Sequence, residues 1–313
     1  MNTASRPRDL TSGSIWKTLL LFALPLLVGS LVQQLYNTVD LAFAGNFVGK
    51  SASAAVGASS LLITCLIGIF GGLGTGSGIV IAQIYGSKDI NRLSRAIHNT
   101  AAIILTSGLL MMLLGYLLAP TYLRLVRTPA ELIDSASSYL RIYFLSFLSV
   151  VTYNFGAGVL RALGDSKRPL YAQLVGGLMN VAMDYLFIRV LDDGVNGVAW
   201  ATLISQTVSA GIILHCLVRL DSAYALRPRK IAFDQDILKQ TISVGVPAGI
   251  QSLVITLSNV IVQYHVNSFG EDAIAAFTAY FKVELIIYLP IVSLGQSIMT
   301  FAGQNAGAGN WER

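Results

Sequence analysis

Apolar residues in this chain gather into eight long runs that short polar connections separate. A helix that crosses a bilayer needs roughly 20 mainly apolar residues, because each residue rises about 1.5 Å and the hydrocarbon core is about 30 Å thick. The runs meet that length, so they predict an all-α integral membrane protein with eight spanning helices. The predicted spans cover residues 15–44, 52–85, 95–119, 134–163, 168–191, 195–220, 236–266 and 273–303.

Composition excludes a soluble enzyme. Charged residues make up 12% of the 313 residues and the mean hydropathy is +0.65, whereas a soluble domain carries roughly 25% charged residues. Cys65 and Cys216 lie inside apolar runs, so neither a disulfide framework nor a cysteine metal site is expected. No span carries an HExxH, GxSxG or clustered acidic motif, so we expect no enzyme and no cofactor.

The basic residues are distributed unevenly between alternate connections. Basic loops remain in the cytoplasm, so this distribution predicts a cytoplasmic N-terminus and a multi-pass protein of the bacterial inner membrane. Because the basic residues do not form an aromatic-rich face, nucleic acid is not expected as a partner. Fourteen lie on the predicted cytoplasmic side, namely Arg6, Arg8, Lys17, Lys88, Arg92, Arg95, Arg161, Lys167, Arg168, Arg219, Arg227, Arg229, Lys230 and Lys239, against Lys50, Arg124, Arg127 and Arg189 on the other.

The start of the chain is repeated near its end at a spacing of about 222 residues. Pro25 aligns with Pro247, and Asn37 with Asn259; after the loss of one residue, Gln83 aligns with Gln304. The second copy starts six helices after the first, an even number, so both cross the membrane in the same direction and a pseudo-twofold axis along the membrane normal is expected. The repeat predicts an N-terminal lobe of six helices in residues 1–225. Residues 226–313 would begin a second lobe with two helices, and four further helices would be absent.

Several polar residues fall inside the spans, where they are expensive and therefore candidates for function. On the first helix Gln33, Asn37 and Asp40 share one face, and on the fifth Asn180 and Asp184 are one turn apart. Thr202 adds a hydroxyl on the sixth helix, and together these groups form an all-oxygen set. Such a set suits Na⁺, or a proton shared between carboxylates. Alternatively, Asp40 could snorkel to the interface, because it lies near the end of its helix. Taken alone, Asn180 could form an interhelical hydrogen bond and Thr202 could be a packing residue.

Other features of the spans are less specific. Pro25 and Pro247 predict kinks, and the run GGLGTGSG (71–78) has no following Lys-Ser/Thr, so it indicates small-residue helix packing rather than a phosphate loop. A second group of polar residues is expected to line a substrate cavity. These are Gln33, Gln34, Tyr36, Asn37, Arg141, Gln251 and Glu284.

Five segments together make the chain resemble the multidrug and toxic compound extrusion (MATE) transporters, nearest the DinF-like bacterial branch. They are QQLYNTVD (33–40), AQIYGSKD (82–89), RALGDSKRP (161–169), NVAMDYLF (180–187) and FAGQNAGAGN (301–310). The resemblance implies a bundle of twelve helices in two lobes, here eight of the twelve. It also implies a monomeric antiporter in the lipid bilayer, which exports cationic or amphipathic small molecules in exchange for Na⁺ or H⁺.

By this resemblance Asp40, Asn180, Asp184 and Thr202 form the coupling-ion site, and Pro25 is the kink of the first helix. Where some branches carry a carboxylate eight residues after the proline of helix seven, this chain has Ile255. Ion coupling through the second lobe is therefore not implied. The alternative is a flippase for lipid-linked sugars or polysaccharides, which would need an Arg- and Lys-rich cavity; Arg141 is the candidate for that role.

Overall fold

The computed structural model describes residues 9–43 and 50–313, and eight long helices dominate these residues. The predicted number of long helices is therefore confirmed. The helices are α1 Ile15–Phe43, α2 Lys50–Gly86, α3 Ile90–Leu125, α4 Ala130–Ala162, α5 Lys167–Asp184, α6 Gly194–Val218, α7 Gln235–Asn267 and α8 Glu271–Gly307; a π-helical turn, η2 Tyr185–Val190, extends α5, and a short 3₁₀ turn, η3 Pro228–Lys230, precedes α7.

Seven of these helices are long and apolar enough to cross a bilayer on their own. The exception is α5, which has only 18 residues and includes Asn180 and Asp184. Its path continues through η2, so α5 and η2 together occupy the predicted span of residues 168–191. The helix with the predicted polar pair is thus the least suited to face lipid, and neighbouring helices must shield it from the hydrocarbon.

Side-chain caps and glycines set the ends of several helices. Asp89 accepts a hydrogen bond from the backbone N–H of Arg92 (2.9 Å), and Asp234 accepts one from Ile237 (3.1 Å). Gly164 and Gly270 have φ angles of +87° and +95°, which an L side chain adopts only with strain. The caps explain why α3 begins at Ile90 rather than at the predicted residue 95: the apolar pattern marks only the part of the helix in hydrocarbon.

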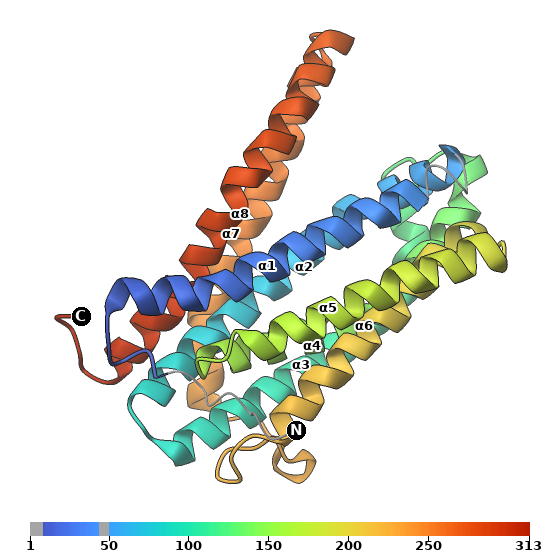
Figure 1. The fold of residues 1–313 in the computed structure, drawn as a ribbon. Coiled ribbons are helices and arrows are strands. Elements are labelled where there is room, and N and C mark those ends of the chain that lie inside the picture. Colours follow the sequence, from blue (N-terminus) through green and yellow to red (C-terminus); the bar gives the residue numbers. More distant parts are fainter. Residues whose placement is uncertain (1–8, 44–49) are drawn as a thin grey trace.

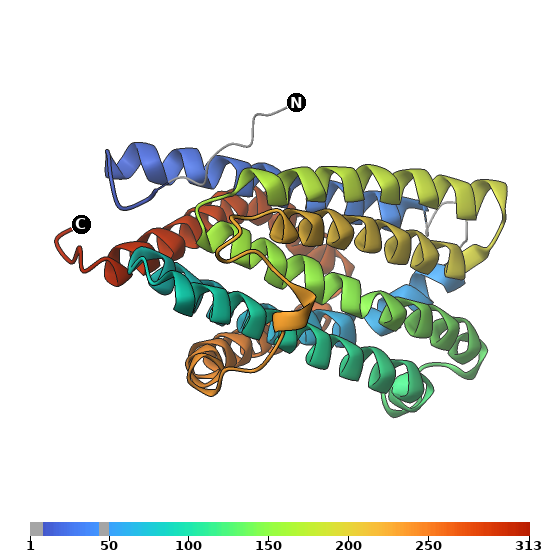
Figure 2. The same ribbon diagram turned by 90° about the horizontal axis from the view of Figure 1, so that it is seen from below.

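Helices α1 to α6 form one bundle, and α7 and α8 leave it at an angle (Figure 1). In the view from below, α4 lies between α3 and α6 (Figure 2). The buried residues of α7 are confined to its first half, from Ile237 to Gly249, and those of α8 to its second half, from Ser293 to Asn305. The structure is therefore closed at the end where α2 and α8 finish, and it is open at the end near Gly270.

Glycines allow α2 and α7 to touch at the closed end. A Cβ added at Gly72 would lie 2.8 Å from the carbonyl oxygen of Gly245, and one added at Gly76 would lie 2.6 Å from that of Thr241. Gly72 and Gly76 of the run 71–78 thus pack against the backbone of α7, which confirms the prediction of small-residue helix packing.

The crossing of α2 and α8 is symmetric. A Cβ added at Gly86 would lie 2.7 Å from the carbonyl carbon of Gln304, and one added at Gly307 would lie 2.7 Å from that of Gln83. Gly86 and Gly307 are 221 residues apart, the same spacing that aligns Gln83 with Gln304, so the repeat exchanges the two contacts as a twofold axis would. Pro25 and Pro247 both lie inside their helices. The division into residues 1–225 and 226–313 remains a prediction.

Candidate functional site

Helices α5 and α6 run antiparallel in a register that is fixed on both sides of the predicted ion site. Toward the closed end, the Ser209 hydroxyl donates to the carbonyl oxygen of Ala172 (3.1 Å). Toward the open end, a Cβ added at Gly197 would lie 3.0 Å from the Cβ of Phe187. Between these contacts, Asn180 and Asp184 on α5 fall at the level of Thr202 and the turn before it on α6. Three of the four predicted ion-site residues therefore lie at neighbouring levels of α5 and α6, and their joint binding of an ion stays a prediction.

Helix α1 covers the other side of α5. A Cβ added at Gly177 would lie 3.2 Å from the Tyr36 ring and 3.4 Å from Val32. The two helices are parallel, since Gly29 faces Leu170 further back, so the turn of α1 after Tyr36 reaches the level of residues 181–184. Asp40 belongs to that turn, but its side chain lies outside the described residues. The predicted approach of the Asp40 and Asp184 carboxylates stays a prediction.

The two polar residues of α5 in this cluster are buried, whereas Thr202 of α6 is half-buried. Asp184 is 0% exposed and Asn180 is 2% exposed. The side-chain oxygen of Asn180 makes no hydrogen bond within the described part of the chain. The Thr202 hydroxyl donates to the carbonyl oxygen of Val198 one turn back (3.0 Å), which leaves its lone pairs available to a ligand. The cluster therefore offers oxygen acceptors, the ligands that Na⁺ prefers.

The backbone changes its hydrogen-bond pattern directly after Asp184. The π-helical turn Tyr185–Val190 closes with a hydrogen bond from the N–H of Leu191 to the carbonyl oxygen of Leu186 (3.0 Å). Such turns are rare and occur often at functional sites. The sequence predicts an ordinary helix here because π-turns leave no mark on hydrophobic periodicity.

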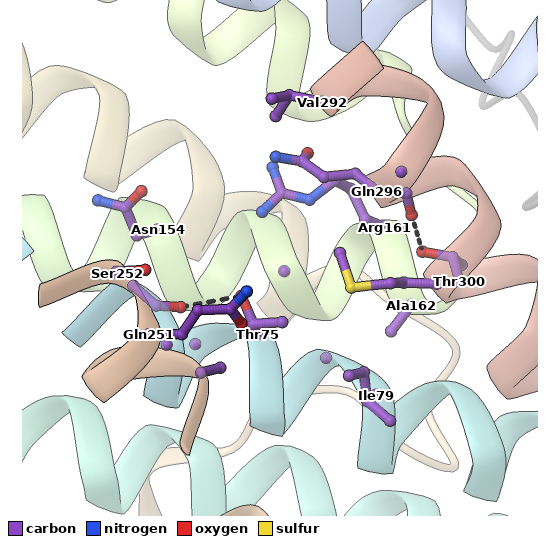
Figure 3. A pocket seen from close by; sticks show the side chains of 18 of the residues that line it. Thr75, Ile79, Asn154, Arg161, Ala162, Gln251, Ser252, Val292, Gln296 and Thr300 are labelled. Carbon is purple, nitrogen blue, oxygen red and sulfur yellow. Dashed lines mark hydrogen bonds between the residues drawn. The ribbon is translucent and has the colours of Figure 1, made fainter. Parts of the chain in front are cut away.

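A separate cavity of about 540 Å³, called the central cavity below, lies between α2, α4, α7 and α8 next to the closed end (Figure 3). Its volume falls in the range of roughly 300 to 1,000 Å³ that is typical of small-molecule sites. The residues that border it are Gly68, Gly71, Gly72, Gly74, Thr75, Gly78, Ile79, Asn154, Gly158, Arg161, Ala162, Ala248, Gln251, Ser252, Val292, Gly295, Gln296, Met299 and Thr300.

Of the residues predicted to line a cavity, Gln251 borders this one within the described part of the chain. Arg141 lies elsewhere, with its guanidinium carbon 5.5 Å from the centre of the Tyr116 ring. Glu284 is half-buried on α8 and precedes the segment of that helix that borders the cavity. The four residues of α1 lie outside this lining: Gln33 and Asn37 are exposed, and Gln34 and Tyr36 are half-buried.

Sequence reasoning missed the charged residue of this cavity. Arg161 ends α4 and was counted among the basic residues that set the topology. A signal was nevertheless present, because Asn154, Gly158 and Arg161 recur at i, i+4 and i+7 and so share one helix face. That face borders the cavity.

A family profile described as MatE matches residues 25–186 and 247–313 of the chain. The probable multidrug resistance protein YpnP of Bacillus subtilis (strain 168) is 32% identical over 307 residues, which are 97% of this chain and 68% of YpnP. YoeA of the same organism, also named a probable multidrug resistance protein, is 31% identical over 100% of this chain and 70% of its own. A solved outward-facing conformation of a multidrug resistance MATE family transporter has a TM-score of 0.88 and 26% identity, covering 97% of this chain and 67% of that one.

Proposed function

The chain belongs to the MATE family of multidrug efflux transporters, and from this premise we propose that it is a secondary antiporter driven by Na⁺ or H⁺ bound beside Asp184. The observation that supports the proposal is the pair of buried residues Asn180 and Asp184 on α5, with the half-buried Thr202 at the same level of α6. A carboxylate at membrane depth costs about 2.5 to 3.5 kcal/mol at the centre of a helix, so it is retained where it has a function. Asp40, one turn beyond Tyr36, would be the second carboxylate of the site.

Ion and cargo influence each other only if each binds the two conformations differently. The wide angle between α7–α8 and the α1–α6 bundle supports a transporter that alternates between open and closed arrangements (Figure 1). With a cytoplasmic N-terminus, the open end near Gly270 faces outward. The shape then corresponds to a state that releases cargo outside the cell.

We propose small amphipathic molecules as the cargo and the central cavity as part of their path. The family resemblance implies organic cations. Among the described residues that line the cavity, Arg161 is the one charged group. Because like charges repel, a cationic part of the cargo would lie away from the Arg161 guanidinium. A lipid-linked sugar flippase is less favoured, because a pyrophosphate calls for several cations rather than one. The transporter would work as a monomer in the bilayer.

The orientation is tested with single cysteines introduced after Cys65 and Cys216 are replaced by Ser. Both new positions are exposed loop residues: Ser222 before α7 and Ser268 between α7 and α8. A membrane-impermeant maleimide is expected to label Ser268→Cys in intact cells and Ser222→Cys only after permeabilisation. The reverse labelling would place the N-terminus outside.

The antiport itself is tested in proteoliposomes loaded with a fluorescent amphipathic drug. We expect an inward gradient of one of the two ions, Na⁺ or H⁺, to drive efflux when it is applied alone. Collapsing that gradient with an ionophore should stop the efflux. Equal efflux with and without both gradients would contradict secondary antiport. Applying the gradients separately identifies the coupling ion.

A further inference from the structure

The last turn of α4 presents a positive charge to the central cavity. Arg161 borders the cavity and is half-exposed, and its guanidinium extends toward Gln296 of α8 (Figure 3). Arginine stays protonated in proteins, so the charge is permanent. A fixed cation among apolar helices is favourable only where it faces water or an anion. The cavity therefore holds a cation that faces either water or the counter-ion supplied by a ligand.

The described residues do not supply that counter-ion. The acid closest along the chain, Asp165, already pairs with Arg168 (3.2 Å) and accepts the backbone N–H groups of Lys167 and Arg168 (both 3.1 Å). Within the described part of the chain, neither a salt bridge nor a hydrogen bond involves the Arg161 side chain. Arg141, the other arginine of α4, is instead stacked on Tyr116. Arg161 thus keeps its donors for a ligand.

The other polar lining residues are neutral, and Gln251, Ser252 and Gln296 add uncharged hydrogen-bond donors beside Arg161. The amide of Asn154 donates to the carbonyl oxygen of Val150 (2.8 Å), and the Thr75 hydroxyl donates to that of Gly71 (3.0 Å). The glycines of α2 and α8 leave room instead, because a Cβ added at Gly71 or Gly295 would meet nothing within 4 Å. The cavity combines one strong cationic donor with a smooth wall against which an apolar body can lie.

We propose that this cavity binds amphipathic molecules with an anionic oxygen group, a carboxylate or another oxyanion, held by the Arg161 guanidinium while the apolar body packs against the glycine face of α2. The planar fork of arginine matches the two oxygens of such a group. A zwitterion also fits, with its cationic end directed away from Arg161. This assignment of substrate class rests on the proposed function as an exporter.

The site is distinct from the ion site in position. Along α6, Gly197 contacts the turn after Asp184, whereas Ile213 packs on Gly156 of α4, just before Arg161. At 1.5 Å per residue, Arg161 and Asp184 lie roughly 25 to 30 Å apart along the bundle. Binding at Arg161 can therefore be measured at equilibrium without any gradient, and its failure is distinguishable from a failure of antiport.

The test measures equilibrium binding of three tritiated probes to the purified protein in maltoside detergent. The probes share one naphthyl-alkyl body and end in a carboxylate, a primary amide or a trimethylammonium group. We expect the carboxylate to bind at least about tenfold more tightly than the amide, as a charge-assisted bidentate contact implies. Arg161→Gln should abolish this preference and Arg161→Lys should keep part of it. Arg141→Gln, the matched change on the same helix, should keep all of it.

Equal binding of carboxylate and amide, tighter binding of the ammonium probe, or a preference that survives Arg161→Gln would overturn the proposal. A loss of the preference in Arg141→Gln would do the same. Should Arg161→Gln not fold, Arg161→Lys carries the test and must weaken carboxylate binding without changing amide binding. Phosphatidylglycerol is added as a competitor of the carboxylate probe. If the lipid binds in an Arg161-dependent way and the carboxylate probe does not, the site takes a lipid headgroup and the small-molecule assignment is wrong.

Discussion

Replacing Asp184 by Asn is expected to reduce gradient-driven efflux to the level of protein-free liposomes while the protein keeps its fold. Asn has nearly the same size and still hydrogen-bonds, but it cannot exchange a proton or balance the charge of Na⁺. The variant loses the difference in ion affinity between the two conformations, and that difference alone links the gradient to the cargo. Efflux is measured in proteoliposomes under the gradient that drives the native protein.

The unfolding temperature separates a coupling role from a structural one. A buried carboxylate that held helices together would leave its partner uncompensated on replacement, at a cost of about 3 to 5 kcal/mol. We expect instead a shift of only about 2 °C, which corresponds to less than about 1 kcal/mol. The matched control is Asp193→Asn, the same change at an exposed carboxylate between η2 and α6, and it should transport like the native protein.

Native transport by Asp184→Asn under the same gradient would remove the proposed ion site from the coupling mechanism. Glu284 on α8 would then be the next carboxylate to replace. A melting temperature lowered by ten degrees or more would assign Asp184 to structure, and its loss of transport would carry no information on coupling.

Much of the fold follows from the sequence because hydrocarbon imposes a simple rule on helix length and polarity. The eight helices were predictable, and so was the packing role of the glycine run 71–78. Helix ends were less predictable, because α3 and α8 run past the apolar segment that marks each span. Caps such as Asp89, rather than hydrophobicity, decide where these helices start.

The angle between α7–α8 and the bundle could not be predicted. A transporter that alternates between two shapes has one sequence for both, so hydrophobic patterning is compatible with either. Arg161 was missed as a cavity residue for the same reason: it borders the cavity only because α8 crosses over α4 near Gln304, whose amide donates to the Ala162 carbonyl oxygen (2.8 Å). Asn180 and Asp184 were identifiable because their spacing places them on one helix face.

The contact between α2 and α7 gives the second large expected effect. Gly72→Ala is expected to lower the free energy of unfolding by at least about 1 to 3 kcal/mol, the usual cost of overpacking. The new Cβ would press on the backbone of α7, 2.8 Å from the carbonyl oxygen of Gly245. Backbone cannot rotate away as a side chain can, so the helices must separate. Thermal unfolding in detergent, followed by intrinsic fluorescence, measures the effect.

The adjacent residue is the control. Gly71→Ala adds the same methyl group to the same helix turn, but nothing lies within 4 Å of the new Cβ. Because Ala favours a helix over Gly by up to about 1 kcal/mol, this variant should melt at the native temperature or slightly above it. A Gly71→Ala protein that melts lower than Gly72→Ala would contradict the described packing of α2 on α7.

A double variant tests whether the two helices meet at this one contact. Gly249 lies opposite Gly72 on α7, and a Cβ added there would lie 2.8 Å from the carbonyl oxygen of Ile69. Once either methyl group has pushed the helices apart, the second meets a gap that is already open. The combined loss of stability in Gly72→Ala/Gly249→Ala should therefore fall short of the sum of the single losses by more than about 0.5 kcal/mol, the limit for independent sites. Strict additivity would mean that each methyl group disturbs a different part of the protein.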